Sequence, residues 1–227
     1  MTGHEIRHQQ TRTSPWPMFA ALGGIAMLSG FLVVLVYQVT RPMIARNQRQ
    51  AIMAAISRVI PGAVRNRAFV VTDSGLRPAK KGETGDIIYA GYDKDGKLAG
   101  IAARAAAQGY ADMIYMLYGY DPKCRCIRGM KVLKMTETPG LGDRIKTDPA
   151  FVANFEALDA RLDESGRKLA HPIVTVKHGS KRHPWEIDAI SGATISSRAV
   201  GKALNASAQR LLPKIAPYID TLRESKP

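Results

Sequence analysis

The sequence predicts an α+β protein, in which a single N-terminal transmembrane helix is followed by a mostly antiparallel α+β domain. Three observations lead to this fold class. An uncharged apolar segment opens the chain, two hairpin patterns occupy its middle, and apolar residues at helical spacing run towards its end. With 227 residues, the chain has room for one ordinary domain and an accessory segment.

Residues 17–39 predict the transmembrane helix. They carry no charge and are long enough to cross roughly 30 Å of hydrocarbon. Trp16 and Tyr37 lie near the two ends, where aromatic side chains favour the membrane interface. A cleaved secretory signal is the alternative, but no convincing small-x-small cleavage site follows the segment. We therefore expect an uncleaved anchor.

The positive charges around the anchor do not settle its orientation. Arg7 and Arg12 precede it, and a larger group of arginines follows it closely: Arg41, Arg46, Arg49 and Arg58. Positive charge alone would keep the large C-terminal part in the cytoplasm, but long domains often cross regardless of charge. The sequence by itself leaves the question open.

We expect five segments along the chain. Residues 1–16 precede the anchor at 17–39, and residues 40–62 form an amphipathic stalk helix that a Pro-Gly pair ends. The main domain covers residues 63–213, and residues 214–227 form a C-terminal tail.

The first half of the main domain predicts strands. Residues 68–72 form a short strand, and Asp95-Gly96 is the turn of a first hairpin. A second hairpin follows, with Cys124 and Cys126 at its tip. No second cysteine pair completes a metal site, and we expect no metal. A disulfide across one residue would be strained, so the two cysteines are expected to be incidental turn residues.

The second half predicts two helices and a strand. Apolar residues on one side predict a helix over residues 149–165, and β-branched residues predict a strand over 173–176. A last helix begins near Thr194, shows apolar residues at helical spacing, and is expected to end at Pro213.

Composition narrows the class of partner. Lys+Arg 33 against Asp+Glu 19 gives a net charge of +14, which suits nucleic acid, an anionic membrane or an acidic partner. Aromatic residues make up 7% of the chain, and no basic stretch alternates with stacking aromatics, so nucleic acid is not expected. No Ser-His-Asp or paired-carboxylate pattern predicts a catalytic residue.

The stretch DAISGATISS, residues 188–197, places Thr194 at or just before the start of the last helix. Unpaired N–H groups and the helix dipole would stabilise a phosphate there. Gly192 and Ala193 leave the approach open, and Lys177 adds positive charge with Lys181 and Arg182. The alternative is an ordinary N-cap made by Thr194 or one of the serines that follow it.

A second stretch, ETPGLGD, covers residues 137–143. Pro139 and Gly140 occupy the second and third positions of a type II turn over residues 138–141. Such a turn exposes backbone N–H groups, and Gly142 permits the close approach of a ligand. An ordinary surface turn is the alternative.

The two stretches together carry a family resemblance. DAISGATISS is similar to the flavinylation motif D-x-x-[ST]-G-A-T-x-[ST], and ETPGLGD resembles the second hallmark of the same FMN-binding domain. Both occur in order behind one anchor. From the anchor to about Leu212, the chain resembles the RnfG family, the G subunits of the Rnf ion-translocating electron transport complexes.

The resemblance implies FMN joined through its phosphate to the hydroxyl of Thr194, by an extracytoplasmic flavin transferase of the ApbE type. Around this acceptor, the recognition sequence would comprise Asp188, Ser191, Gly192 and Ala193. The flavin would be lined by Glu137, Thr138, Leu141 and Gly142. The family often has His at the position of Met135, so a proton-handling role is not expected there.

The resemblance also implies a location and a role. The N-terminus would be cytoplasmic, and the FMN domain would lie on the extracytoplasmic side of the bacterial inner membrane. The protein would relay electrons between NADH and ferredoxin with other Rnf subunits as partners. One alternative is the NqrC subunit of the sodium-pumping NADH:quinone reductase. Another is a membrane-tethered binding module without flavin.

Overall fold

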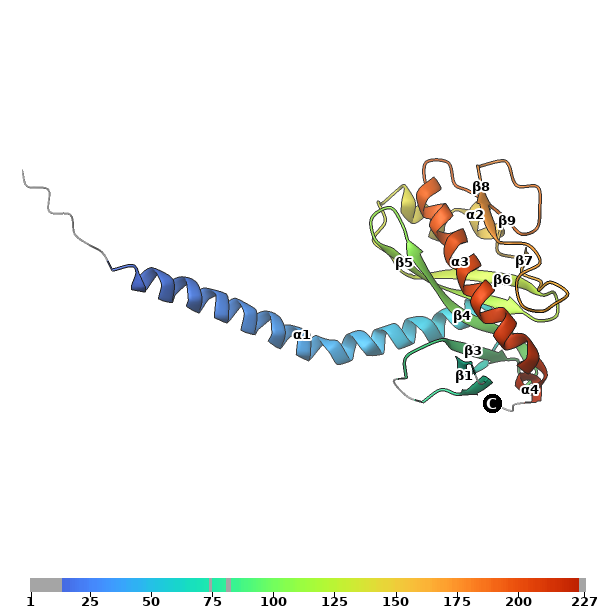
Figure 1. The fold of residues 1–227 in the computed structure, drawn as a ribbon, viewed down its shortest axis with the longest axis horizontal. Coiled ribbons are helices and arrows are strands. Elements are labelled where there is room, and N and C mark those ends of the chain that lie inside the picture. The colour runs from blue at the N-terminus through green and yellow to red at the C-terminus, as the bar shows by residue number, and fades with distance from the viewer. Residues whose placement is uncertain (1–13, 74, 81–82, 225–227) are drawn as a thin grey trace, which may run out of the picture. The chain divides into compact units, whose positions relative to one another are not determined.

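The computed structural model describes residues 14–73, 75–80 and 83–224. Arg7 and Arg12 therefore lie outside the described residues. The chain divides into two compact units, Met1–Arg49 and Gln50–Pro227. Figure 1 shows one long helix followed by a domain of strands and helices. The predicted fold class is confirmed.

One continuous helix, α1 (Trp16–Val59), replaces the separate anchor and stalk helices expected from the sequence. Pro42 lies inside it, where a proline removes a single backbone hydrogen bond without ending the helix. The predicted stop is confirmed, because α1 ends at Val59 and Gly62 adopts a left-handed φ of 86°. Among the described residues, α1 is the helix long and apolar enough to cross a membrane.

A seven-stranded antiparallel sheet forms the body of the second unit, in the order β2-β1-β3-β4-β5-β6-β7. Its strands are β1 (Arg65–Thr72), β2 (Gly75–Pro78), β3 (Ile87–Tyr92), β4 (Leu98–Gln108), β5 (Met113–Asp121), β6 (Cys126–Lys134) and β7 (Leu158–Asp159). Both predicted hairpins are confirmed as β3–β4 and β5–β6. A separate parallel pair joins β8 (Val174–Val176) to β9 (Glu186–Asp188).

Alternating side chains of the sheet enter two apolar clusters. On β4, Ile101 and Ala103 belong to the main core beneath α3 (Thr194–Ile215), which lies across the sheet in Figure 1. Ala102, between them, belongs to a second cluster with Ile56 and Val59 at the end of α1. The two faces of the sheet are therefore covered by different helices.

Short helical segments complete the domain: η1 (Gly142–Lys146), α2 (Pro149–Ala153), η2 (Ala216–Tyr218) and α4 (Ile219–Glu224). The helix predicted over residues 149–165 is wrong beyond its first turn. Asn154 ends α2 by donating its side-chain amide to the carbonyl oxygens of Phe151 and Asp188. The chain then enters β7, so Leu158 is buried through strand pairing rather than on a helix.

Two further expectations are corrected. Pro213 does not end the last helix, because α3 continues to Ile215. Cys124 and Cys126 are not incidental turn residues, since they form a disulfide. Arg125 between them adopts a left-handed φ of 53°, which lets the short turn bring the two cysteines together. The position at the hairpin tip is as predicted.

Candidate functional site

A tight turn leads into α3 at the SGAT stretch. The N–H of Ala193 donates to the carbonyl oxygen of Ile190 at 3.1 Å, which closes a turn over residues 190–193. Gly192 occupies its third position with φ of 81°, the conformation that a type II turn demands there. A Cβ at Gly192 would meet nothing within 4 Å, so glycine is needed for the backbone conformation rather than for space.

Ser197 holds this turn against the helix. Its buried hydroxyl accepts a hydrogen bond from the N–H of Ile190 at 3.1 Å and donates to the carbonyl oxygen of Ala193 at 2.9 Å. Ala193 itself is buried in the main core, so it anchors the turn instead of opening an approach to it. Thr194, the first residue of α3, is thereby fixed in position.

The Thr194 hydroxyl is available for chemistry. The residue is half-buried, and no described residue hydrogen bonds with its hydroxyl. The cap position of α3 is Ala193, with no side-chain cap, so neither Thr194 nor the following serines act as the expected N-cap. The N–H groups in the first turn of a helix lack intrahelical partners and lie at the positive end of the helix dipole. Such an environment would stabilise a phosphate attached to the hydroxyl.

The ETPGLGD stretch is joined to this helix through Glu137. Its carboxylate accepts a short hydrogen bond from the Ser196 hydroxyl and others from the N–H groups of Ala111, at 3.1 Å, and Tyr110, at 3.3 Å. The type II turn that follows is confirmed, with the N–H of Leu141 on the Thr138 carbonyl oxygen at 3.2 Å. We call the Glu137–Ser196 contact the latch.

The latch is buried, and its charge is stabilised by its donors. Burial raises the pKa of Glu137, but hydrogen bonds from Ser196 and the backbone outweigh it, so the pKa is lowered overall. Gly142 fits the latch closely, because a Cβ there would lie 2.6 Å from the Ser196 hydroxyl oxygen. Glu137 and Gly142 were expected to line a ligand, and the structure shows that both contact the protein itself.

Three exposed side chains with apolar surface lie on the segments that the latch joins. The exposed fractions are 69% for Tyr110, 51% for Leu141 and 54% for Ile195. Each residue lies on, or next to, a segment that hydrogen bonds of Glu137 hold together. Thr138 is exposed on the same turn as Leu141. Tyr110 and Ile195 were missed by the sequence analysis, because the Glu137 contacts join segments that lie far apart in the sequence.

Arg144 is a further residue that the sequence analysis missed. Its guanidinium donates to the carbonyl oxygen of Ser191 at 3.5 Å and pairs with the Asp148 carboxylate at 2.7 Å. It therefore brings positive charge to the exposed side of the SGAT turn, where Ser191 and Gly192 lie. Its place directly after the ETPGLGD stretch was the available signal.

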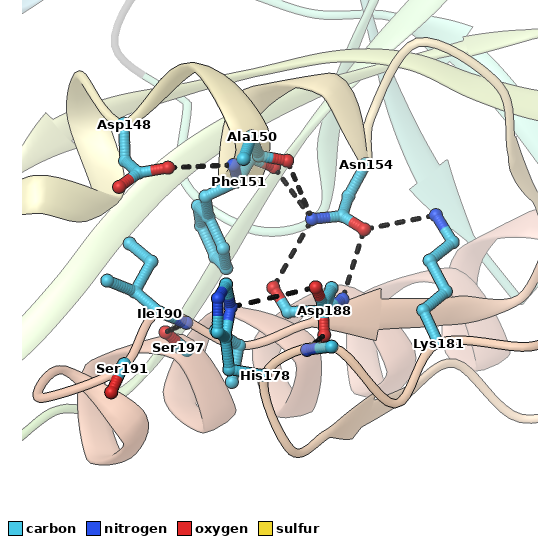
Figure 2. A network of polar contacts seen from close by, with 12 residues as sticks. Asp148, Ala150, Phe151, Asn154, His178, Lys181, Asp188, Ile190, Ser191 and Ser197 are labelled. Carbon is cyan, nitrogen blue, oxygen red and sulfur yellow. Dashed lines mark hydrogen bonds and ion pairs between the residues drawn. The ribbon is translucent and has the colours of Figure 1, made fainter.

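Asp188 holds the adjoining loop in place (Figure 2). Its carboxylate accepts from the N–H of Gly179 at 2.7 Å and lies 3.7 Å from the Nδ1 atom of His178. Asn154 accepts hydrogen bonds from the Asp188 N–H and from the Lys181 Nζ atom, both at 3.0 Å. Lys181 is thus bound to Asn154 rather than free beside Thr194.

Two expected cationic contributors remain outside this network. Lys177 is exposed directly after β8, and Arg182 is exposed with its backbone N–H on Glu186 at 2.6 Å. Within η1, the Oδ1 atom of Asp143 is buried without a partner among the described residues. A buried carboxylate oxygen of this kind is available to a donor from a bound molecule.

Comparison with known proteins shows which class of protein this chain belongs to. Residues 109–209 match the family model of the FMN-binding domain, and residues 20–59 match the RnfG N-terminal region. The first match contains both the latch and the SGAT turn, and the second covers most of α1. The class is therefore an FMN-binding domain behind an N-terminal helix that could span a membrane.

Similar proteins identify the family. The chain is 30% identical over 183 residues to the G subunit of an ion-translocating oxidoreductase complex from Methanosarcina acetivorans, covering 81% of this chain and 87% of that protein. It is 29% identical to the protein of the same name from Pseudomonas aeruginosa, with coverages of 94% and 92%. The chain belongs to the family of ion-translocating oxidoreductase complex G subunits.

The fold has a wider relative. The C subunit of the Na⁺-translocating NADH-quinone reductase from Parabacteroides distasonis aligns with a TM-score of 0.50 and 19% identity, covering 72% of this chain and 80% of that one. This likeness concerns the fold alone. The RnfG N-terminal match and the named relatives favour the G-subunit family over the NqrC alternative.

Proposed function

We propose that this protein is a membrane-anchored electron-carrier subunit of an Rnf-type ion-translocating complex, with FMN joined to Thr194 through a phosphoester. Other Rnf subunits would be its partners in relaying electrons between NADH and ferredoxin. The observation that carries the proposal is the Thr194 hydroxyl, unpartnered among the described residues at the start of α3. The match to the FMN-binding domain supports the cofactor.

The residues present fit FMN. Thr194 offers a free nucleophile for a phosphoester, and Arg144 and the first turn of α3 supply positive charge and N–H donors for its phosphate. Exposed Leu141 and Ile195 offer apolar surface for a ring, and the Asp143 oxygen offers an acceptor. When bound, FMN would supply the redox chemistry, and the protein would position it and tune its potential.

The protein's own residues would act by holding that geometry. Ser197 fixes the SGAT turn, and the latch fixes the ETPGLGD turn against the same helix. Asp188 orders the loop beside β9, which precedes the turn. An ApbE-type transferase would therefore meet a preformed acceptor, with Ser191 and Gly192 exposed for recognition.

The disulfide supports an extracytoplasmic domain. Disulfides persist in oxidising compartments and are rare in the cytoplasm, so Cys124–Cys126 favours placing the second unit outside. This outweighs the four arginines that follow the anchor, because a long domain can be translocated regardless of charge. In this topology α1 would cross the bacterial inner membrane and contact its lipid.

Two substitutions at one position test the attachment. Thr194→Val keeps the side-chain shape but removes the hydroxyl, whereas Thr194→Ser keeps a hydroxyl. Coexpressed with the transferase, wild type should carry the mass of FMN, Thr194→Val should lack it, and Thr194→Ser should retain a fraction. Intact mass and in-gel flavin fluorescence measure this. Flavin retained in Thr194→Val would refute the attachment site, and no flavin in wild type would favour the binding-module alternative.

A further inference from the structure

The β5–β6 hairpin carries a disulfide that the flavin site does not use. Cys124 lies in the exposed turn and Cys126 is the first residue of β6, with 5% exposure. One sulfur therefore belongs to a solvent-exposed residue while the other belongs to a buried one. This pairing of an exposed and a buried cysteine suits thiol–disulfide exchange, in which one sulfur is attacked and the other resolves.

The disulfide contributes little to holding the fold. It closes a loop with a sequence separation of 2, and the stabilisation expected from restricting the unfolded chain becomes smaller as the closed loop becomes shorter. The hairpin is already fixed by backbone pairing between β5 and β6, from Tyr115 with Lys134 to Asp121 with Cys126. Its tip is also tied to the neighbouring segment, because the N–H of Ala160 donates to the Arg125 carbonyl oxygen at 3.1 Å. The disulfide can therefore open without unfolding the sheet.

The backbone at the tip favours opening. Arg125 has φ of 53°, a left-handed conformation that a residue with a Cβ adopts at a cost. The closed three-residue ring requires the two cysteines to stay together across this residue. Reduction releases that requirement, so the dithiol form is not opposed by the local backbone.

Positively charged residues neighbour the exposed Cys124 in the sequence. Lys123 and Arg125 flank Cys124 and are exposed, and Arg128 lies on the strand that follows. The carboxylates nearby are already engaged: Asp121 accepts from the Lys123 N–H at 2.8 Å and lies 3.7 Å from Arg128, and Asp159, opposite Cys126, pairs with Arg161. Exposed cations attract an incoming thiolate and stabilise a thiolate that is released.

We propose that Cys124–Cys126 is a second redox site, which exchanges electrons with a dithiol by thiol–disulfide exchange. A thiolate of the dithiol attacks the Cys124 Sγ atom, the Sγ–Sγ bond breaks, and the Cys126 Sγ atom takes the electron pair and a proton. The second thiol of the dithiol then loses its proton and attacks the first sulfur of the dithiol, which is bonded to Cys124 in the mixed disulfide. Cys124 is released and takes up a proton as a thiol. Two electrons and two protons pass to the cysteine pair, and the dithiol becomes a disulfide.

The experiment uses the full chain in detergent and dithiothreitol as the dithiol. The folded protein is equilibrated at set ratios of reduced to oxidised dithiothreitol, and free thiols are then blocked with N-ethylmaleimide. Mass spectrometry of the peptide that contains both cysteines counts the adducts. We expect two adducts to appear and disappear reversibly with the ratio, at an unchanged melting temperature. Adducts that form only in denaturant, or a lowered melting temperature on reduction, would make the disulfide a structural staple and overturn the proposal.

Single variants test which sulfur is attacked. Free Cys124 in Cys126→Ser should react with Ellman's reagent at least about tenfold faster than free Cys126 in Cys124→Ser, because reactivity follows exposure and positive surroundings. Lys123→Gln should slow the anionic reagent several-fold, whereas Lys94→Gln, at the tip of the other hairpin, should not. Equal rates for the two cysteines would refute the assignment. The flavin content of the same samples is measured separately, and it tests the proposed attachment at Thr194 rather than the disulfide proposal.

Discussion

The substitution Glu137→Gln measures how much the latch contributes to the stability of the fold. The carboxylate has two oxygens that accept hydrogen bonds from Ser196, Tyr110 and Ala111. A carboxamide keeps the shape but replaces one oxygen with an NH₂ donor, so at least one buried donor loses its acceptor. That loss costs about 1–3 kcal/mol. For a protein of this size the melting temperature should fall by about 2–12 °C, at about 2–4 °C per kcal/mol.

The pH dependence gives the same substitution a sign. The pKa of folded Glu137 lies below its ordinary value of 4.5, so its stabilisation is fully present above that value and is lost as the pH falls through the folded pKa. The gap between wild type and Glu137→Gln should therefore be constant near neutral pH and narrow in acid. Thermal melts of the detergent-solubilised chain from pH 7 downwards measure it.

Controls separate the latch from a general effect of charge. Glu156→Gln makes the same change at an exposed carboxylate and should leave the melting temperature within its error. Ser196→Ala should destabilise on its own, and its cost should shrink in the Glu137→Gln background, because contacting residues are not additive. The proposed latch is wrong if Glu137→Gln and Glu156→Gln have the same melting temperature. It is also wrong if the stability costs of Glu137→Gln and Ser196→Ala are fully additive in the double variant.

Three further outcomes are expected. Leu141→Ala should leave FMN attached but alter its fluorescence and midpoint potential, whereas Val152→Ala, at another exposed apolar residue, should change neither. Gly119→Ala should lower the melting temperature more than Gly91→Ala. The added Cβ overlaps the backbone carbonyl of Val59 at Gly119, whereas at Gly91 it meets side-chain atoms of Ile60 and Ala63 at longer distances. A reporter active only outside the cytoplasm, fused after Pro227, should be active, and a stable but inactive fusion would reverse the topology.

Local chemistry explains what the sequence predicted correctly. The turns at Asp95-Gly96 and at residues 138–141 depend on glycine and proline at set positions, which the sequence displays directly. The start of α3 at Thr194 follows from the glycine turn and the helical spacing behind it. Each of these features is decided within a few residues.

Distant contacts explain what the sequence could not predict. Phe151 and Phe155 have helical spacing, but Asn154 ends α2 with a hydrogen bond to Asp188, which lies far along the chain. The disulfide depends on the left-handed backbone conformation of Arg125, which an arginine at this position does not predict. In the first place a distant contact overruled a helical pattern, and in the second a local backbone conformation that the residue type does not predict made the disulfide possible.

The latch changes how the two sequence stretches are to be understood. Each was first interpreted as a set of groups facing a ligand, yet Glu137 and Gly142 of one stretch pack directly against Ser196 of the other. The stretches are therefore a single folded unit, in which one half contains Thr194, the proposed acceptor, and the other half holds the helix that carries it. It follows that a substitution at Ser196 should disturb the reactivity of Thr194, although Ser196 is not among the groups proposed to hold the phosphate. The flavin content of Ser196→Ala would then fall between those of wild type and Thr194→Val, whereas a content equal to wild type would show that Thr194 keeps its position without the latch.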